Sequence, residues 1–276
     1  MSQGFFMNRI IHFVQNLSLD ITLGSVISSM FLAKVMGVEV TSSMMIGLAI
    51  AIWLIYTFDH LRDAFKTQGK ATNPRHAFHQ KYFKPVAGIS VVVFSLGVYN
   101  LQFLPWYTIE IGLVLVVLSG LYFIYLMLAK RAINKELFAA TVYVAGIATA
   151  PLSQVNSFQI EWLLVLMVLW ILAYGNLLII PLYELELDEK DNQESIVTRM
   201  GLKKVRSILI WLLFFCTVLI QFYGYEGGNL TAYAILLLMV FTLIVLLVRP
   251  QYFRQFQLYR ILSDGIFFLP GIMLLL

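Results

Sequence analysis

The sequence predicts an all-α polytopic membrane protein with nine transmembrane helices around a central cleft, in a single domain covering residues 1–276. The chain is 60% hydrophobic and only 12% charged, and its mean hydropathy is +0.84. Soluble domains usually carry about 25% charged residues, which solvate their surface. Long apolar runs also recur along the whole chain. These observations exclude a soluble enzyme, a disordered chain and a disulfide-stapled secreted module.

The predicted elements follow one another from the N-terminus. Phe5, Phe6, Ile10, Phe13 and Val14 recur at helical spacing, so we expect a short interfacial helix that leads into the bilayer. A segment needs about 20 mostly apolar residues to cross the hydrocarbon core. Nine segments satisfy this requirement, at residues 18–38, 41–58, 85–102, 107–128, 136–154, 160–182, 205–224, 229–248 and 257–275. The lone cysteine, Cys216, falls in an apolar run, where we expect it to fill space.

The basic residues orient these spans. All Lys and Arg residues except Lys34 lie in the N-terminal arm, in the connections after the second, fourth, sixth and eighth spans, or at the start of the span that follows such a connection. The positive-inside rule places those connections in the cytoplasm. We therefore expect a multi-pass protein of the bacterial inner (cell) membrane, whose net charge of +4 reflects basic loops and not nucleic-acid binding. Lys34 is near the outer end of the first span, where its side chain can reach water.

Two of the cytoplasmic connections also concentrate acidic residues. Asp59 and Asp63 are four residues apart after the second span, and Glu184 and Asp188 repeat this spacing after the sixth. Each pair lies on one helical face, about 5–6 Å apart between Cβ atoms. Two carboxylates at that distance repel each other unless a cation lies between them. The alternative interpretation is that these are solvated charges paired with neighbouring Lys and Arg residues.

Mg²⁺ suits such pairs because it takes oxygen ligands and commonly uses one or two carboxylates together with substrate phosphate oxygens. Two acidic faces opposed across a cleft could hold Mg²⁺ ions on a diphosphate. Basic side chains of the first acidic connection would neutralise the remaining phosphate charge. These are Arg62, Lys66, Lys70, Arg75 and Lys81.

The stretch ELELDEKDNQESIVTRMG, residues 184–201, resembles the second aspartate motif of the UbiA-type membrane prenyltransferases. Its motif positions are filled at the family's spacing by Glu184, Glu186, Asp188, Asn192, Ser195 and Gly201. Asp59 and Asp63 match the last two aspartates of the first motif, N-D-x-x-D-x-x-x-D. The positions of its Asn and first Asp are occupied by Ile55 and Tyr56. The further matches are Arg75, near the family's Asn-Arg-Pro element, and Lys130 with Arg131, at its Lys-Arg pair.

The resemblance implies Mg²⁺-dependent transfer of an isoprenyl group from a polyprenyl diphosphate to an acceptor, such as an aromatic quinone precursor, at the cytoplasmic side. Membrane lipids would surround the chain. The catalytic residues and Mg²⁺ ligands would be Asp59, Asp63, Glu184 and Asp188. The diphosphate would contact Arg62, Lys66, Arg75, Lys130, Arg131 and Asn176. The departures at positions 55 and 56 leave three readings open: an active transferase, a terpene cyclase on the same scaffold, or a non-catalytic lipid-binding or transport protein.

Four further residues have two interpretations each. Asn176 could face the cleft from within the sixth span or bond a neighbouring helix. Asp264 follows Arg260 by four residues, which favours a local ion pair over an intramembrane functional carboxylate. His76 and His79 flank the basic connection and could contact phosphate, but no histidine spacing indicates a metal site.

Overall fold

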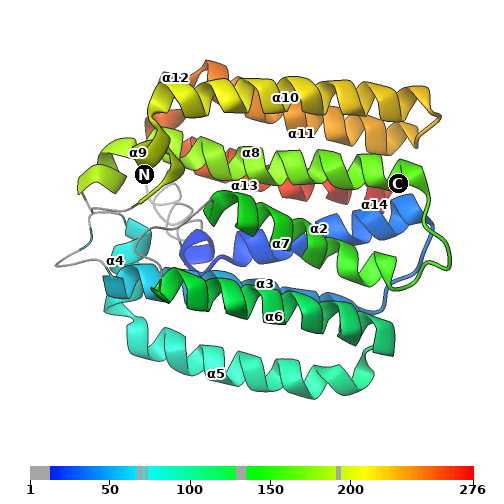
Figure 1. Cartoon of the computed structure of the whole chain (residues 1–276), viewed down its shortest axis with the longest axis horizontal. Helices are drawn as coiled ribbons and strands as arrows, with labels where there is room; N and C mark the ends of the chain where they lie inside the picture. The colour runs from blue at the N-terminus through cyan, green and yellow to red at the C-terminus, as the bar shows by residue number, and fades with distance from the viewer. Residues whose placement is uncertain (1–12, 67–70, 72–73, 129–134, 191–193) are drawn as a thin grey trace, which may run out of the picture.

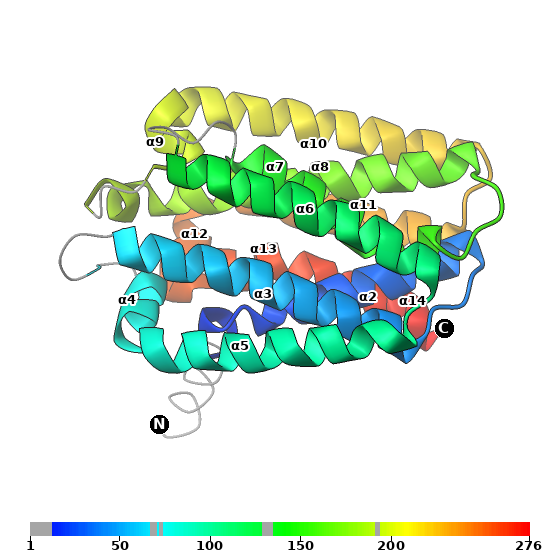
Figure 2. The ribbon, with the colours of Figure 1, turned by 60° about the horizontal axis from the view of Figure 1, so that its bottom comes forward.

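The computed structural model describes residues 13–66, 71, 74–128, 135–190 and 194–276, and it has no strand within them. The long helices run side by side as a bundle, and Figures 1 and 2 show the short helices α4, α9 and α12 together at one end. In chain order the elements are α2 (Leu19–Met36), α3 (Ser42–Lys66), α4 (Pro74–Lys81), α5 (Phe83–Asn100), η1 (Leu101–Phe103), α6 (Trp106–Leu128), α7 (Lys135–Leu152), α8 (Ile160–Lys190), α9 (Ile196–Met200), α10 (Leu202–Tyr225), α11 (Leu230–Val248), α12 (Pro250–Arg254), η2 (Gln255–Gln257), α13 (Leu258–Gly265), η3 (Ile266–Gly271) and α14 (Ile272–Leu275).

The all-α membrane architecture is confirmed. Eight helical segments of the described chain are long and apolar enough to cross a membrane. The ninth predicted span is α7, which packs against α2, α6 and α8 and is 18 residues long. It begins with Lys135 and Glu136, which lower its mean hydropathy. The expected interfacial helix falls largely on residues 1–12, outside the described part of the chain.

Two helices continue beyond their predicted apolar spans. The span expected at 41–58 becomes α3, which ends at Lys66, and the span expected at 160–182 becomes α8, which ends at Lys190. The extension of α3 contains the helix formers Leu, Arg, Ala and Lys, that of α8 contains Leu, Glu and Lys, and neither contains Gly or Pro, so nothing breaks the helix. With 31 residues, α8 is about 46 Å long, whereas the hydrocarbon core is about 30 Å thick. Asp59, Asp63, Glu184 and Asp188 therefore lie on helix ends and not in loops.

The last span is irregular. It consists of α13, the 3₁₀ segment η3 and α14. Pro270 lies inside η3, where it has no backbone N–H to donate. The ammonium group of Lys34, near the end of α2, donates a hydrogen bond to the carbonyl of Met273. The one basic residue outside the basic connections thus stabilises a helix end that leaves carbonyls without intrahelical partners.

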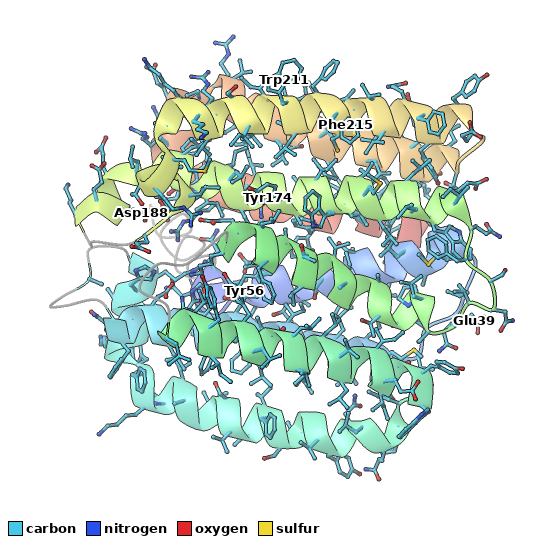
Figure 3. The ribbon with its side chains drawn as sticks, in the orientation of Figure 1. Glu39, Tyr56, Tyr174, Asp188, Trp211 and Phe215 are labelled. Carbon is cyan, nitrogen blue, oxygen red and sulfur yellow. The ribbon has the colours of Figure 1, made fainter. Side chains whose placement is uncertain are left out.

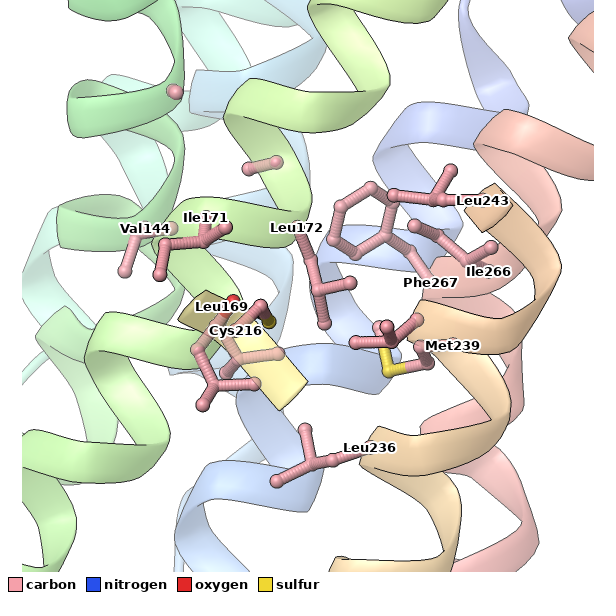
Figure 4. Packing of buried hydrophobic residues seen from close by; sticks show 14 of the residues in the cluster. Val144, Leu169, Ile171, Leu172, Cys216, Leu236, Met239, Leu243, Ile266 and Phe267 are labelled. Carbon is pink, nitrogen blue, oxygen red and sulfur yellow. Dashed lines mark hydrogen bonds between the residues drawn. The ribbon is translucent and has the colours of Figure 1, made fainter. Parts of the chain in front are cut away.

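The core lies around α8. Figure 4 shows Leu169 and Leu172 of α8 packed with Cys216 of α10 and Met239 of α11, all four fully buried. Cys216 is free and buried, which confirms its predicted space-filling role. The hairpin of α5 and α6 is different, since only 11% of each span is buried inside the protein. Its apolar side chains are those a lipid bilayer would cover.

Candidate functional site

A cavity of about 230 Å³ lies at the end of the bundle where α4 and α9 meet α3 and α8. Figure 3 shows Asp188 and Tyr56 toward this end, whereas Glu39 is at the opposite end. The cavity brings together most of the residues predicted from the sequence: Asp59, Asp63, Arg75, Asn176, Glu184 and Asp188 all line it. Three others are not placed, because the side chain of Lys66 and all of Lys130 and Arg131 fall outside the described part of the structure.

The first carboxylate pair faces two cations. Asp59 and Asp63 lie one turn apart on α3, as their spacing predicts. Lys135 Nζ, from the first turn of α7, is 3.0 Å from Asp59 Oδ2 and 2.9 Å from Asp63 Oδ2. Arg62 Nη2, on the same face of α3, is 3.0 Å from Asp59 Oδ1 and 2.7 Å from Asp63 Oδ1. Arg62 does not itself line the cavity. It contacts the two carboxylates that do.

The second carboxylate pair divides into two environments. Glu184 is buried and accepts hydrogen bonds from both Nε and Nη2 of Arg260, the latter at 2.6 Å, and from the Tyr259 hydroxyl at 2.7 Å. Asp188 is one turn closer to the end of α8, less buried, and lines the cavity beside Glu194. The helical spacing therefore places one carboxylate in an ion pair and the other at the mouth.

Asn176 and Asp264 both line the cavity and are hydrogen-bonded to each other. Asn176 Nδ2 donates to Asp264 Oδ1 at 3.0 Å, and both side chains are buried. Asn176 therefore both faces the cavity and bonds another helix, so its two interpretations hold together. The expected local ion pair between Arg260 and Asp264 is wrong, because Arg260 pairs with Glu184. A fork of two N–H donors matches a carboxylate better than a single contact along one helix does.

The two histidines of helix α4, His76 and His79, lie in different environments. His76 lines the cavity, whereas His79 is buried away from its walls, with its Nδ1 2.9 Å from the carbonyl oxygen of Arg75. Burial lowers the pKa of His79, so this ring is neutral at pH 7. Arg75 Nη2 donates to the carbonyl of Gln15 at 2.9 Å, which fixes the arginine against the N-terminal segment. Only His76 has the access to phosphate predicted for both histidines.

A smaller, apolar pocket of about 70 Å³ adjoins the main cavity between α3, α6 and α7. The two spaces share part of their walls, namely Tyr56, Asp59, Lys135, Ala139 and Tyr143. The remaining walls of the small pocket are mostly apolar, with Ile52 and Phe138 among them. The charged cavity thus shares part of its wall with an apolar pocket that could accommodate a hydrocarbon chain.

Comparison with known proteins identifies the fold. No protein-family model matches the sequence, and no curated protein sequence is similar to it. Solved structures do match. The apo structure of a UbiA homolog from Aeropyrum pernix K1 aligns with a TM-score of 0.67 at 14% identity, over 94% of this chain and 98% of that one. The chain has the UbiA fold. A UbiA homolog from Archaeoglobus fulgidus, bound to DMAPP and Mg²⁺, aligns with a TM-score of 0.62 at 12% identity, over 96% and 99% of the two chains.

The donor chemistry of this UbiA-fold cavity suits a divalent cation bound together with a phosphate. Among the described residues, the lining carboxylates outnumber the lining Lys and Arg side chains, Arg75, Lys135 and Arg260. These carboxylates are Asp59, Asp63, Glu136, Glu184, Asp188, Glu194 and Asp264. No three His, Cys, Asp or Glu side chains of the described chain form a metal-binding group by themselves. Mg²⁺ needs only one or two carboxylates where substrate phosphates supply further oxygens.

Sequence reasoning missed two cations of the UbiA-fold site. Lys135 was counted only among the basic residues of its connection, and Arg260 was considered only as a local partner of Asp264. The available signal for Lys135 is its position at the start of a helix on the same predicted side of the membrane as the acidic connections. For Arg260 no local signal exists, because its partner is 76 residues away in the sequence.

Proposed function

We propose that the chain is an integral membrane transferase that binds an isoprenyl diphosphate with Mg²⁺ in the charged cavity and transfers the isoprenyl group to an acceptor. The observation that carries the proposal is the cavity itself. It joins both acidic motifs to fixed cations at one end of a UbiA fold, and it adjoins an apolar pocket. We further propose that this end faces the cytoplasm, because the basic connections lie there.

The fixed cations would receive the diphosphate. Arg75, Lys135 and Arg260 line the cavity and come from three different helices, so they surround a bound anion. Charge develops on the oxygen of the departing diphosphate, and donors already held in place stabilise it without reorganising. Mg²⁺, when bound, would neutralise part of that charge, and we propose that Asp188, which lines the cavity at the end of α8, helps to hold it.

The apolar part of the site would handle the isoprenyl group. Tyr56 and Tyr143 stand at the junction of the two spaces, and Phe267 lines the charged cavity beside them. The ring centroids of Tyr143 and Phe267 are 5.1 Å apart in an edge arrangement. Aromatic faces stabilise a nearby cation, such as the allylic carbocation left when diphosphate departs. Tyr56, which stands where the family motif has an aspartate, therefore supplies a ring where a metal ligand would be.

The proposal is tested by diphosphate release. Purified protein in lipid nanodiscs is incubated with radiolabelled farnesyl or geranylgeranyl diphosphate and an aromatic acid as acceptor, with Mg²⁺ or with EDTA, and the inorganic pyrophosphate released is measured. We expect Mg²⁺-dependent release that Asp188→Asn abolishes. Glu189→Gln, at the next position but outside the cavity wall, is the matched control and should retain it. The proposal fails if neither diphosphate is cleaved under any of these conditions.

The same assay separates the terpene cyclase alternative, which the aromatic rings at the junction favour. A cyclase would release pyrophosphate without any acceptor and yield a cyclic hydrocarbon or alcohol, detectable by mass spectrometry. A transferase would need an added acceptor, such as an aromatic acid, and would yield a conjugate. Mg²⁺-dependent binding of the diphosphate without cleavage would indicate the non-catalytic alternative.

A further inference from the structure

The carboxylates of Asp59 and Asp63 form an ion quartet with Lys135 and Arg62. Each of the four carboxylate oxygens lies within 3.0 Å of one cation: the two Oδ2 atoms face Lys135 Nζ, and the two Oδ1 atoms face Arg62 Nη2. Two negative and two positive charges cancel. The quartet therefore differs from a metal site awaiting its ion, in which the carboxylates would carry a net negative charge.

The quartet is built into the fold. Asp59, Arg62 and Asp63 stand at positions i, i+3 and i+4 of α3 and so share one face. Lys135 approaches that face from the start of α7. The side chains of the quartet are 10–30% exposed, so water screens their attraction only in part. The two cations together bring the same charge as one divalent ion.

A metal ion at this pair would have to displace Lys135. Mg²⁺ demands oxygen ligands at about 2.0–2.1 Å in octahedral geometry. Lys135 Nζ already lies between the two Oδ2 atoms, at hydrogen-bonding distance from both. A second observation agrees: Tyr56 stands where the resembling motif has its first aspartate, so this wall offers a metal ion one carboxylate fewer.

We infer that Lys135, with Arg62, occupies the place of a metal ion at the Asp59–Asp63 pair, so that metal is held only on the opposite wall, at Asp188. An ammonium group has three N–H donors, and the two aspartates use two of them. The third is available to a phosphate oxygen, since Lys135 lines the cavity. The two aspartates thus position a fixed cation for the diphosphate. This inference rests on the proposed function and assigns different roles to its two acidic motifs.

The inference is tested by metal binding without turnover. Mn²⁺ replaces Mg²⁺, inorganic pyrophosphate is added to the full chain in detergent, and bound Mn²⁺ is measured by electron paramagnetic resonance. Asp188→Asn should raise the Kd for Mn²⁺ by about tenfold or more. Asp59→Asn should leave this Kd unchanged, whereas Lys135→Met should add a second bound Mn²⁺ per chain. Glu189→Gln is the control for a general loss of acidic charge at the end of α8.

Equal losses of Mn²⁺ affinity in Asp59→Asn and Asp188→Asn would overturn the inference alone. Failure of the wild-type chain to bind Mn²⁺ with pyrophosphate would overturn the metal-dependent function as well. A second measurement needs no variant: Fe²⁺ with ascorbate cleaves a backbone next to the bound metal. Cuts mapped by mass spectrometry to the end of α8 support the inference, and cuts in α3 around Asp59 contradict it.

Discussion

Replacing Arg260 by Met tests the ion pair that joins α13 to α8. Arg260 donates to both oxygens of Glu184, and the side chains are only 10% and 5% exposed. Met retains much of the aliphatic volume but leaves the Glu184 carboxylate buried without a cation. The perturbation therefore removes charge compensation more than packing.

The expected loss follows from these contacts. Hydrogen bonds to charged groups contribute about 1.5–3 kcal/mol each, so two of them contribute about 3–6 kcal/mol. Removing one partner of a buried ion pair generally costs about 3–5 kcal/mol. The hydroxyl of Tyr259 still donates to Glu184, which places our expectation near the lower end, at about 3 kcal/mol. This is a large part of a typical unfolding free energy of about 5–15 kcal/mol.

The assay is unfolding by SDS in mixed micelles, followed by tryptophan fluorescence. Arg254→Met is the matched control, because its guanidinium is 3.8 Å from Glu186 with both side chains well exposed. Exposed pairs contribute about 0–1 kcal/mol, so the control should unfold almost like the wild type. A double-mutant cycle of Arg260→Met with Glu184→Gln should give a coupling of at least about 2 kcal/mol. A coupling near zero, or equal losses in the two arginine variants, would refute the reasoning.

Three further predictions use the same unfolding assay. Gly24→Val should lower the free energy of unfolding by about 1–3 kcal/mol, since a Cβ at this position would lie 3.0 Å from the Cβ of Phe267. Gly112→Val is the control, because a Cβ there has no neighbour within 4 Å, and it should leave stability unchanged. Equal losses in the two variants would contradict the prediction. Lys34→Met should cost about 1 kcal/mol by removing a hydrogen bond to the last span, and an unchanged midpoint would show that the bond contributes nothing. Burial lowers the pKa of His79, so as pH falls through about 6.5 the unfolded chain takes up a proton here before the folded chain does, and stability is lost. The decrease in unfolding free energy from pH 7 to pH 5 should therefore be smaller in His79→Gln than in the wild type. Identical pH profiles of stability in the two proteins would exclude this contribution.

The fold could be predicted from the sequence because its signals are local. Each apolar run is long enough to cross a bilayer by itself, and the positions of Lys and Arg orient the runs without any knowledge of packing. Hydropathy does not show where a helix stops, since α3 and α8 continue beyond their apolar spans into polar stretches that contain no Gly or Pro to end them. The 3₁₀ segment of the last span depends on how Pro270 is accommodated by neighbouring helices.

The site could be predicted only in part. The spacing of Asp59 and Asp63 placed both on one face, because helical geometry alone decides this. It could not show that Lys135 would meet them, since this contact joins residues 72 positions apart. Local spacing even favoured the wrong partner for Arg260, because the geometry that selects Glu184 exists only once α13 packs against α8.

The pairing of these charges bears on what the cavity does. Buried ion pairs often stabilise a fold no better than apolar side chains of the same size, because desolvation offsets their attraction. Stability alone therefore does not account for placing Lys135 and Arg260 among carboxylates next to an apolar pocket. The arrangement suits the proposed binding of a diphosphate, because carboxylates that accept from Lys and Arg would hold those cations in place before the ligand arrives. A diphosphate entering the cavity would then meet oriented donors instead of flexible side chains, which is the condition under which electrostatic stabilisation of a departing anion is strongest.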